Sequence, residues 1–212
     1  EKTAQIIGSK HSVKIFDPSE LLKISKNFIE KLDEPNGDRS CIPTFLLCSH
    51  ARTEVKVALG GDGGDELFSG YSRYPGLNKY LENGKFFNAT ESLKAYLSFG
   101  LPVFGFPVCN IFEKDMTANY LSSLATHLYS PVDMEQAIRF IDFKSYLPGA
   151  VLSKVDRSSM QSSLEVRTPF FSPDLLDFCS RLPHQFLFRG KEMKPVLRDI
   201  CRTIGLEPVA NL

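Results

Sequence analysis

Four glycines and three acidic residues are concentrated in one short segment of the sequence. The segment reads Val57-Ala58-Leu59-Gly60-Gly61-Asp62-Gly63-Gly64-Asp65-Glu66-Leu67-Phe68. An apolar strand that runs into glycines and then into a helix is the usual place for a ligand at the carboxyl end of a strand. Glycines let the backbone approach a ligand and present its N–H groups. Acids at the start of the next helix are favoured by the helix dipole.

Two other interpretations of this segment stay open on residue types alone. One is a tight turn whose acidic residues cap the following helix and bind no ligand. The other is a calcium loop, because Asp62, Asp65 and Glu66 supply oxygen atoms. The alternating acids and the distal glutamate of an EF-hand loop are absent, which disfavours the calcium interpretation.

The composition is that of a folded chain with one large or two small domains. Hydrophobic residues make up 42% of the 212 residues, which is enough for a sizeable core. Lys plus Arg and Asp plus Glu both number 25, so the net charge is zero. We therefore expect neither nucleic acid nor an anionic membrane surface as a partner. No apolar run reaches the length of about 18 residues that a membrane span requires.

Cysteine and histidine residues form neither a disulfide pattern nor a zinc pattern. An odd number of cysteines without a Cys-x-x-Cys pair suits reduced thiols in the cytoplasm, where we expect the protein to be located. The cysteines are Cys41, Cys48, Cys109, Cys179 and Cys201, and the scattered histidines are His11, His50, His127 and His184. We expect buried thiols and no zinc site, including at Cys48, which lies in an apolar run near His50.

The hydrophobic pattern predicts an α/β edge in the first part of the chain. The predicted elements are a helix ending at Gly8, a strand at 12–16, a helix from Pro18 through Leu32 capped by Asp17, a turn-rich loop at 33–38, a helix from near 43 to 52, and a buried strand at 55–59. Alternation of strands and helices is typical of a parallel α/β layer.

The pattern changes after residue 80, where a mainly helical region is predicted. Residues 118–129 and 134–146 look helical, and the remainder to 212 reads as helices joined by turns that contain proline. The Phe-rich stretch 86–112 is interpreted as core. The predicted fold class is therefore α/β, with a partial parallel sheet followed by a helical region.

The segment from Leu59 to Tyr71 closely resembles the second nucleotide-site motif of asparagine synthetases, Ser-Gly-Glu/Asp-Gly-x-Asp-Glu-x-x-x-Gly-Tyr. Other segments resemble the family's motifs in the same order: Asp33-Glu34-Pro35 with Asp38 and Ser40, Tyr146-Leu147-Pro148, Lys154-Val155-Asp156-Arg157, Ser163-Leu164-Glu165-Val166-Arg167-Thr168-Pro169-Phe170, and Gly190-Lys191-Glu192-Met193-Lys194-Pro195-Val196-Leu197-Arg198. Ordered blocks over residues 33–198 are far more specific than one glycine loop.

This resemblance implies an ATP-pyrophosphatase fold of the adenine nucleotide alpha-hydrolase type, with 1–80 as the α/β edge of the nucleotide site and 81–212 as the helical region. It implies that ATP activates a carboxylate as an acyl-adenylate with release of pyrophosphate, and that an amine then attacks. The expected reaction converts aspartate to asparagine with ammonia from glutamine. A sugar acid of polysaccharide assembly is an alternative acceptor. A non-catalytic module that binds a partner is the remaining hypothesis.

Roles for individual residues follow from the same resemblance. Gly60, Gly61 and Gly63 would line the nucleotide, and Asp65 would help to hold Mg²⁺ on the pyrophosphate. Gly60 stands where the family usually has serine, so a hydroxyl contact is missing. The ligands expected at this site are therefore ATP and Mg²⁺.

The resemblance also implies a catalytic lysine and a residue for the amine. Lys194 would stabilise the adenylation transition state as a fixed positive charge near the α-phosphate. Lys191 is the alternative, because the spacing before Leu197-Arg198 varies. Asp62 would position or deprotonate the amine nucleophile, and it replaces the glutamate of many asparagine synthetases. Several other charged residues are interpreted mainly as structural: the pairs Asp156-Arg157 and Glu165-Arg167, and the loop acids Glu34 and Asp38.

Two parts of the family pattern are not found in this sequence. They are the first phosphate loop, Ser-Gly-Gly-x-Asp-Ser, and the N-terminal glutaminase domain with its nucleophilic cysteine. We therefore expect a partial synthetase domain that lacks full activity alone and has an exposed sheet edge. The expected partners are the small-molecule substrates and a glutaminase domain in the full-length protein, and a homodimer is left open.

Overall fold

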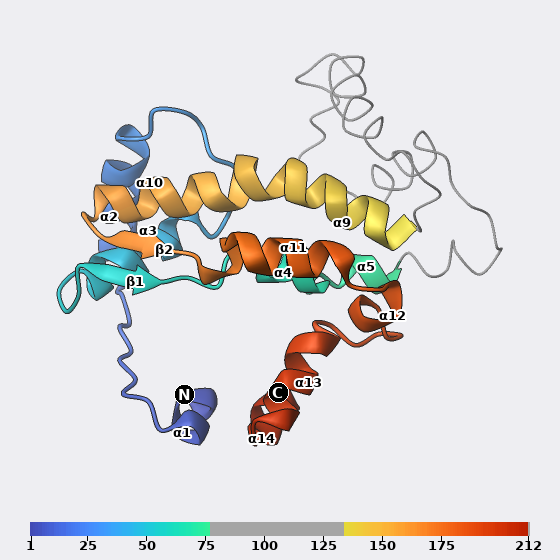
Figure 1. Ribbon diagram of the computed structural model, residues 1–212. Coiled ribbons are helices and arrows are strands. Elements are labelled where there is room, and N and C mark those ends of the chain that lie inside the picture. The colour runs from blue at the N-terminus through green and yellow to red at the C-terminus, as the bar shows by residue number, and fades with distance from the viewer. Residues whose placement is uncertain (77–133, 212) are drawn as a thin grey trace, which may run out of the picture.

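The computed structural model describes residues 1–76 and 134–211, and in these ranges most elements are helices, with a small sheet near one end of the molecule (Figure 1). The predicted helix at 118–129, the Phe-rich stretch 86–112, Cys109 and His127 lie outside the described residues. No helix in the described ranges is long and apolar enough to cross a membrane.

The elements lie in the following order along the chain. They are α1 (Lys2–Ile7), α2 (Pro18–Glu30), α3 (Cys41–Ala51), β1 (Val57–Leu59), α4 (Gly64–Phe68), α5 (Arg73–Gly76), α9 (Met134–Lys144), the π-helical segment η3 (Leu147–Leu152), α10 (Ser153–Gln161), β2 (Glu165–Arg167), the 3-10 helix η4 (Pro169–Phe171), α11 (Pro173–Arg181), α12 (His184–Leu187), α13 (Pro195–Thr203) and α14 (Glu207–Ala210).

Local signals place the first two helices as the sequence predicts. Helix α1 ends at Gly8, whose φ of 67° is the left-handed conformation that glycine adopts readily. Helix α2 begins after Asp17, whose carboxylate accepts a hydrogen bond from the Ser19 N–H at 2.8 Å. Phe28, on the predicted apolar stripe, is buried and stacks on Phe45 of α3. The predicted helix caps are confirmed.

Residues 12–16, however, do not form the predicted strand. They have no regular secondary structure, and Ile15 is 86% exposed. A strand needs a neighbour that pairs with its backbone N–H and C=O groups. Within the part of the chain that the structure describes, no strand lies beside this segment. Alternation of apolar and polar side chains was therefore insufficient to predict a strand at residues 12–16.

The described sheet consists of β1 and β2, which run parallel. Val57 pairs with Glu165, and Leu59 pairs with Arg167. The parallel α/β arrangement is thus confirmed. Strand β2, however, lies in the last part of the mainly helical region, where only helices and turns were predicted. The prediction that β1 is buried is also wrong, since Leu59 is 74% exposed. With one neighbouring strand among the described residues, β1 keeps an open edge.

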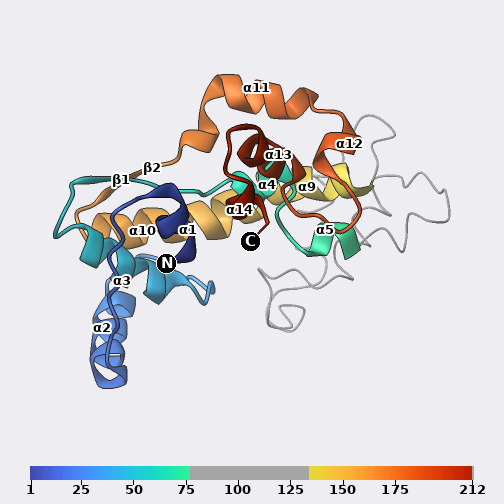
Figure 2. The same ribbon diagram turned by 90° about the horizontal axis from the view of Figure 1, so that it is seen from below.

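A nearly continuous helical run crosses the molecule from α9 through η3 to α10 (Figures 1 and 2). Helix α9 confirms the helix predicted from residue 134. Helix α10 packs closely on α3, because small side chains lie between the two helices. Ser158 donates a hydrogen bond to the Cys41 carbonyl at 3.3 Å, and the hydroxyls of Ser49 and Ser162 lie 3.0 Å apart.

A hydrophobic core lies where α4 packs against the C-terminal helices. Leu67, Phe68 and Cys179 are buried at its centre. Packed around them are Phe143, Phe170, Leu175, Leu176, Leu182, Val196 and Leu197. Short helix α4, which follows the glycine-rich turn, is therefore fixed between α11 and α13 by burial of apolar surface.

The buried thiols agree with the sequence interpretation. Cys41, Cys48 and Cys179 are free and buried, and Cys201 is partly buried. Burial raises the pKa of the Cys41, Cys48 and Cys179 thiols above the ordinary value. A raised pKa keeps a thiol protonated and poorly nucleophilic at neutral pH.

A buried polar cluster joins α5 to α9. The fully buried Asp142 carboxylate accepts hydrogen bonds from the Arg73 guanidinium at 2.5 Å and from the Tyr74 hydroxyl at 2.7 Å. Removing one partner of a buried ion pair leaves the other charge without compensation in a place from which water is excluded.

We expect Asp142→Asn to lower the free energy of unfolding by about 3 kcal/mol, because Arg73 then stays buried without a counter-charge. Urea unfolding measures this change. The matched control is Asp177→Asn on α11, which breaks an exposed ion pair to Arg181 of 2.7 Å and should change the free energy by less than about 1 kcal/mol. Equal effects of the two substitutions would contradict the assignment.

Candidate functional site

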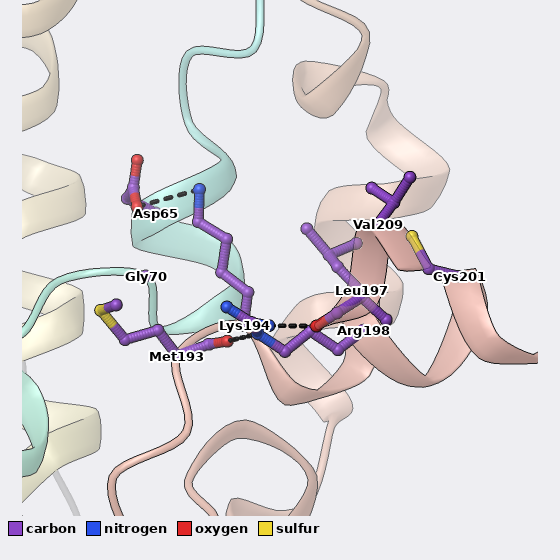
Figure 3. Close-up of a pocket in the computed structure, with 9 residues that line it drawn as sticks. Asp65, Gly70, Met193, Lys194, Leu197, Arg198, Cys201 and Val209 are labelled. Atoms are coloured by element: carbon purple, nitrogen blue, oxygen red, sulfur yellow. Dashed lines mark hydrogen bonds and ion pairs between the residues drawn. The ribbon is translucent and has the colours of Figure 1, made fainter. Parts of the chain in front are cut away.

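Lys194 and Asp65 meet beside the turn that follows β1 (Figure 3). The Lys194 Nζ lies 3.0 Å from the Asp65 Oδ1, and the side chains are 36% and 35% exposed. Asp65 belongs to the first turn of α4, and Lys194 is the N-cap residue of α13. The fold thus brings together two residues that the sequence analysis assigned to one site.

Lys191, the alternative to Lys194, has a different position. It lies on the exposed turn after Gly190, between Arg189 and Glu192, which form an antiparallel bridge. Lys194 lines the cavity next to Asp65, and Lys191 is not among the lining residues. The geometry therefore favours Lys194 as the lysine that reaches the glycine-rich turn.

A cavity of about 310 Å³ lies beside the ion pair. Its polar wall contains Asp65, Lys194 and Arg198, and most of the apolar remainder comes from helices α13 and α14. The other lining residues are Gly70, Met193, Leu197, Cys201, Val209 and Ala210. The cavity therefore combines two cationic side chains and one carboxylate with an apolar surface.

Gly70 makes the approach of Lys194 to Asp65 sterically feasible. A Cβ atom at residue 70 would lie 1.9 Å from the Asp65 Oδ1 and 2.3 Å from the Lys194 Cε. The backbone holds the same arrangement, because the Lys194 N–H donates to the Ser69 carbonyl at 3.3 Å and the Gly70 N–H to the Asp65 carbonyl at 2.9 Å. Any other residue at position 70 would have to displace one of these groups.

The glycines predicted to line a nucleotide do not share one environment. The Gly60 N–H donates to the Arg167 carbonyl at 2.8 Å, which extends the β1–β2 pairing and differs from the expected donor role. Gly63 has a φ of 87°, and a Cβ there would lie 2.6 Å from the Phe171 ring. Gly61 is exposed, and a Cβ there would meet nothing within 4 Å. Gly61 is therefore the glycine of this set with free space beside it.

The Asp62 carboxyl folds back over Gly60. Its Oδ2 lies 2.8 Å from the position that a Cβ of residue 60 would take. The glycine found where the family usually has serine therefore makes room for this carboxyl. Burial raises the pKa of Asp62 above its ordinary value, and the Lys154 ammonium opposes the rise. A raised pKa makes a carboxylate a better proton acceptor.

Charged residues of the loop 33–40 fasten that loop to α10. The Lys154 Nζ donates to the Asp38 Oδ2 at 2.9 Å and to the Ser40 Oγ at 2.8 Å. Burial opposes ionisation of Asp38, but the hydrogen bonds from Ser40 and Lys154 outweigh it and keep its pKa below the ordinary value.

Ion pairs of α10 also fasten the loop, whereas the ion pair on β2 does not. Arg157 forms ion pairs with Asp33 at 2.6 Å and Glu34 at 2.7 Å. These contacts agree with a structural role for the loop acids. Arg167 pairs at 2.7 Å with Glu165 on β2 itself, so this pair does not connect the sheet to a helix.

The contact between the buried Glu66 and the partly buried Tyr71 was not predicted from the sequence. The Tyr71 hydroxyl donates to Glu66 Oε1 at 2.7 Å, and the Arg73 guanidinium stacks 3.8 Å above the Tyr71 ring. Burial raises the pKa of Glu66. The pair fixes the chain on both sides of Gly70. Both residues belong to the quoted motif, but spacing alone did not show that they contact each other.

The described residues fit a metal held jointly with phosphates better than a metal enclosed by protein. Among the residues that the structure covers, no group of three or more His, Cys, Asp or Glu side chains is placed to hold a metal ion. Mg²⁺ is commonly held by one or two carboxylates together with waters and substrate phosphates. The Asp65 carboxylate, which is 35% exposed and lines the cavity, suits that arrangement.

Comparison with known proteins identifies the family of the chain. A family model described as asparagine synthase matches residues 1–209. The chain therefore belongs to the asparagine synthase family, which confirms the resemblance noted in the sequence. No solved structure gave a significant match.

Curated relatives match along the chain. Glutamine-hydrolysing asparagine synthetase 1 of Bacillus subtilis is 25% identical over 253 residues, covering 100% of this chain and 38% of the relative. A putative glutamine-hydrolysing asparagine synthetase of Mycobacterium bovis is 29% identical over 244 residues, covering 98% of this chain and 35% of the relative. The chain thus spans little more than a third of the length of these relatives.

We expect Gly70→Ala to lower the free energy of unfolding by about 2 kcal/mol, because the new methyl group overpacks against Asp65 and Lys194. The penalty should largely disappear in an Asp65→Ala, Lys194→Ala background, which a double-mutant cycle by urea unfolding measures. Gly37→Ala is the control, since a Cβ there meets nothing within 4 Å. A penalty that persists unchanged in the double-variant background would exclude this explanation.

Asp62→Asn should raise the free energy of unfolding at pH 7, because it removes a carboxylate whose ionised form is disfavoured by burial. The folded-state pKa lies above the ordinary 3.8, so the gain should shrink as the pH falls through the folded-state pKa towards 3.8. Urea unfolding at several pH values measures it.

Asp38→Asn should behave in the opposite way. The folded-state pKa of Asp38 is lowered, so its carboxylate stabilises the fold at neutral pH, and that contribution is lost as the pH falls through the folded-state pKa. The same sign for both substitutions at pH 7 would show that the environments of the two carboxylates are misassigned.

Proposed function

We propose that the protein carrying this chain is an ATP-dependent carbon–nitrogen ligase that converts a carboxylate to an amide through an acyl-adenylate, with release of AMP and pyrophosphate. Aspartate is the proposed acceptor, and ammonia derived from glutamine is the proposed nucleophile. The relatives named as glutamine-hydrolysing asparagine synthetases support both assignments.

The observation that carries this proposal is the contact between Lys194 and Asp65. The two side chains lie 3.0 Å apart next to the turn after β1, in a chain of the asparagine synthase family. The ion pair holds a cation and a possible metal ligand together at the carboxyl end of a strand, which is where α/β proteins bind ligands. An isolated capping acid, the alternative reading of this turn, gives no reason for a lysine from α13 to cross Gly70.

The proposed roles of these two residues follow from charge. Breaking the bond to pyrophosphate builds negative charge on the leaving group, and Mg²⁺ held by Asp65 would neutralise part of that charge. Lys194 would place its ammonium near the α-phosphate, where a fixed positive charge stabilises the transition state. Because Gly70 leaves no side chain in between, Lys194 can turn from Asp65 towards a phosphate without moving its backbone.

Asp62 is proposed to act on the amine. Its half-buried carboxyl has a raised pKa, which favours proton acceptance from an attacking amine. Gly61, exposed and with free space beside it, is the proposed backbone donor to the nucleotide. Asp62 is shorter than the glutamate of many asparagine synthetases, and its carboxyl folds over Gly60. The space next to this carboxyl should therefore differ from the space next to a glutamate. A sugar acid therefore remains the second proposed acceptor.

The same proposal includes the fold type, the division of the chain and the partner domain. We propose the adenine nucleotide alpha-hydrolase fold, with 1–80 as the edge of the nucleotide site and 81–212 as the helical region. The parallel pairing of β1 and β2 supports it. A glutaminase domain is the proposed partner within the protein, as the names of the relatives suggest. A cytoplasmic location and a homodimer remain predictions.

In the protein that carries this chain, Lys194→Ala and Asp65→Ala should each lower the rate of ATP-dependent pyrophosphate release with aspartate by at least about a hundredfold. Lys194→Ala removes the ammonium group, and Asp65→Ala removes the carboxylate proposed to hold Mg²⁺, so each variant loses positive charge at the phosphates. A coupled pyrophosphate assay measures the rate, and the same assay with uronic acids in place of aspartate tests the second acceptor.

Lys191→Ala is the control, because Lys191 lies outside the cavity. It should retain pyrophosphate release within about threefold of the unsubstituted protein, as expected for an exposed side chain. Loss of the reaction in Lys191→Ala together with normal turnover in Lys194→Ala would show that Lys191, and not Lys194, is the catalytic lysine. Normal turnover in Asp65→Ala would remove Asp65 from the site.

A further inference from the structure

Four side chains on the surface next to Lys194 form a closed ring of alternating charge. The charge ring consists of Arg189, Glu192, Asp199 and Arg202. Arg189 binds Asp199 with both guanidinium Nη atoms, at 2.7 and 3.2 Å. Arg202 lies 2.7 Å from Asp199 and 3.2 Å from Glu192. Glu192 closes the ring at 3.5 Å from Arg189.

The charge ring joins two segments of chain that meet at Lys194. Arg189 and Glu192 belong to the bridged turn before Lys194, and Asp199 and Arg202 belong to α13 after it. The ring therefore fastens the incoming chain to the helix that Lys194 caps. On the same stretch, the Arg198 Nε donates to the Met193 carbonyl at 2.8 Å.

Lys194 itself has a backbone conformation that needs such support. Its φ is 55° and its ψ is 47°, which is the left-handed region that non-glycine residues rarely adopt. It also precedes Pro195, and a following proline further restricts the backbone. Unfavourable conformations of this kind persist where the surrounding contacts determine them and are concentrated at functional sites.

We infer that the charge ring is a positioning device for Lys194, and that Asp199 is its central positioning residue because it accepts from both arginines. The ring holds the strained backbone at Lys194, which directs the ammonium across Gly70 to Asp65. Exposed single ion pairs contribute little, but bidentate geometry and a network are the conditions under which such pairs matter. This role in catalysis rests on the proposed function, whereas the role in placing Lys194 does not.

The first test measures the placement of Lys194 without any assay of activity. The protein is treated with a limiting amount of an amine-acylating reagent, and peptide mass spectrometry gives the acylation rates of Lys194 and Lys191. Asp199→Asn should raise the Lys194 rate by about two- to fivefold, the population change expected when an ion-pair network of this class is broken. Lys191, which is already exposed, serves as the internal control and should keep its rate.

Two further variants make this test specific. Arg202→Gln, which breaks the ring from the other side, should also raise the Lys194 rate, and Asp199→Glu, which keeps the charge, should restore most of the original rate. The matched control is Asp177→Asn, which breaks an exposed pair of 2.7 Å on α11 away from Lys194. An unchanged Lys194 rate in both ring variants, or an equal rise in Asp177→Asn, would overturn the inference.

The second test concerns pyrophosphate release. Asp199→Asn and Arg202→Gln should lower kcat by about tenfold or more, because a small displacement of a catalytic group is costly, while KM for ATP changes little. If the unsubstituted protein that carries this chain releases no pyrophosphate, the proposed function fails, and the acylation rates alone decide on the ring. If Lys194 becomes more reactive but kcat is unchanged, the ring positions the residue but has no part in catalysis, and that half of the inference is wrong.

Discussion

The space left by the missing side chain at Gly70 is the constraint on which the site depends. A cation from α13 and a carboxylate from α4 need to approach within contact distance, and the chain between α4 and α5 passes directly beside them. A single methyl group there would overlap both side chains. The contacts around this point, from the Ser69 carbonyl to the Glu66–Tyr71 hydrogen bond, hold the backbone in a path that leaves room for both side chains.

The two sides of the site are held by different physical means. Helix α4 is fixed by apolar burial, since Leu67 and Phe68 lie in the core against α11 and α13. The segment before α13 is held in part by polar contacts at the surface, including the Arg189–Asp199 ion pair. The carboxylate thus sits on a helix packed into the core, and the lysine lies between that core and a turn fastened by exposed ion pairs. Contacts that are partly exposed suit a residue such as Lys194 that has to exchange Asp65 for another anionic partner.

The sequence was informative where the structure is determined locally or by ordered motifs. The Asp17 cap and the Gly8 helix end depend on neighbouring residues, and both were predicted correctly. The predictions that β1 is buried and that residues 12–16 form a strand were wrong, because both properties depend on which strands lie alongside. The motif order brought Asp65 and Lys194 into one hypothesis. The need for glycine at residue 70 and the ring around Asp199 follow from loop packing, which spacing does not encode.

The wide helical turns of η3 have a consequence for the run from α9 to α10. A π-helical turn contains more residues than an α-helical turn, and one inserted residue rotates every later side chain by about 100° around the axis. With this change of phase, one rod contacts α4 through α9 and α3 through α10.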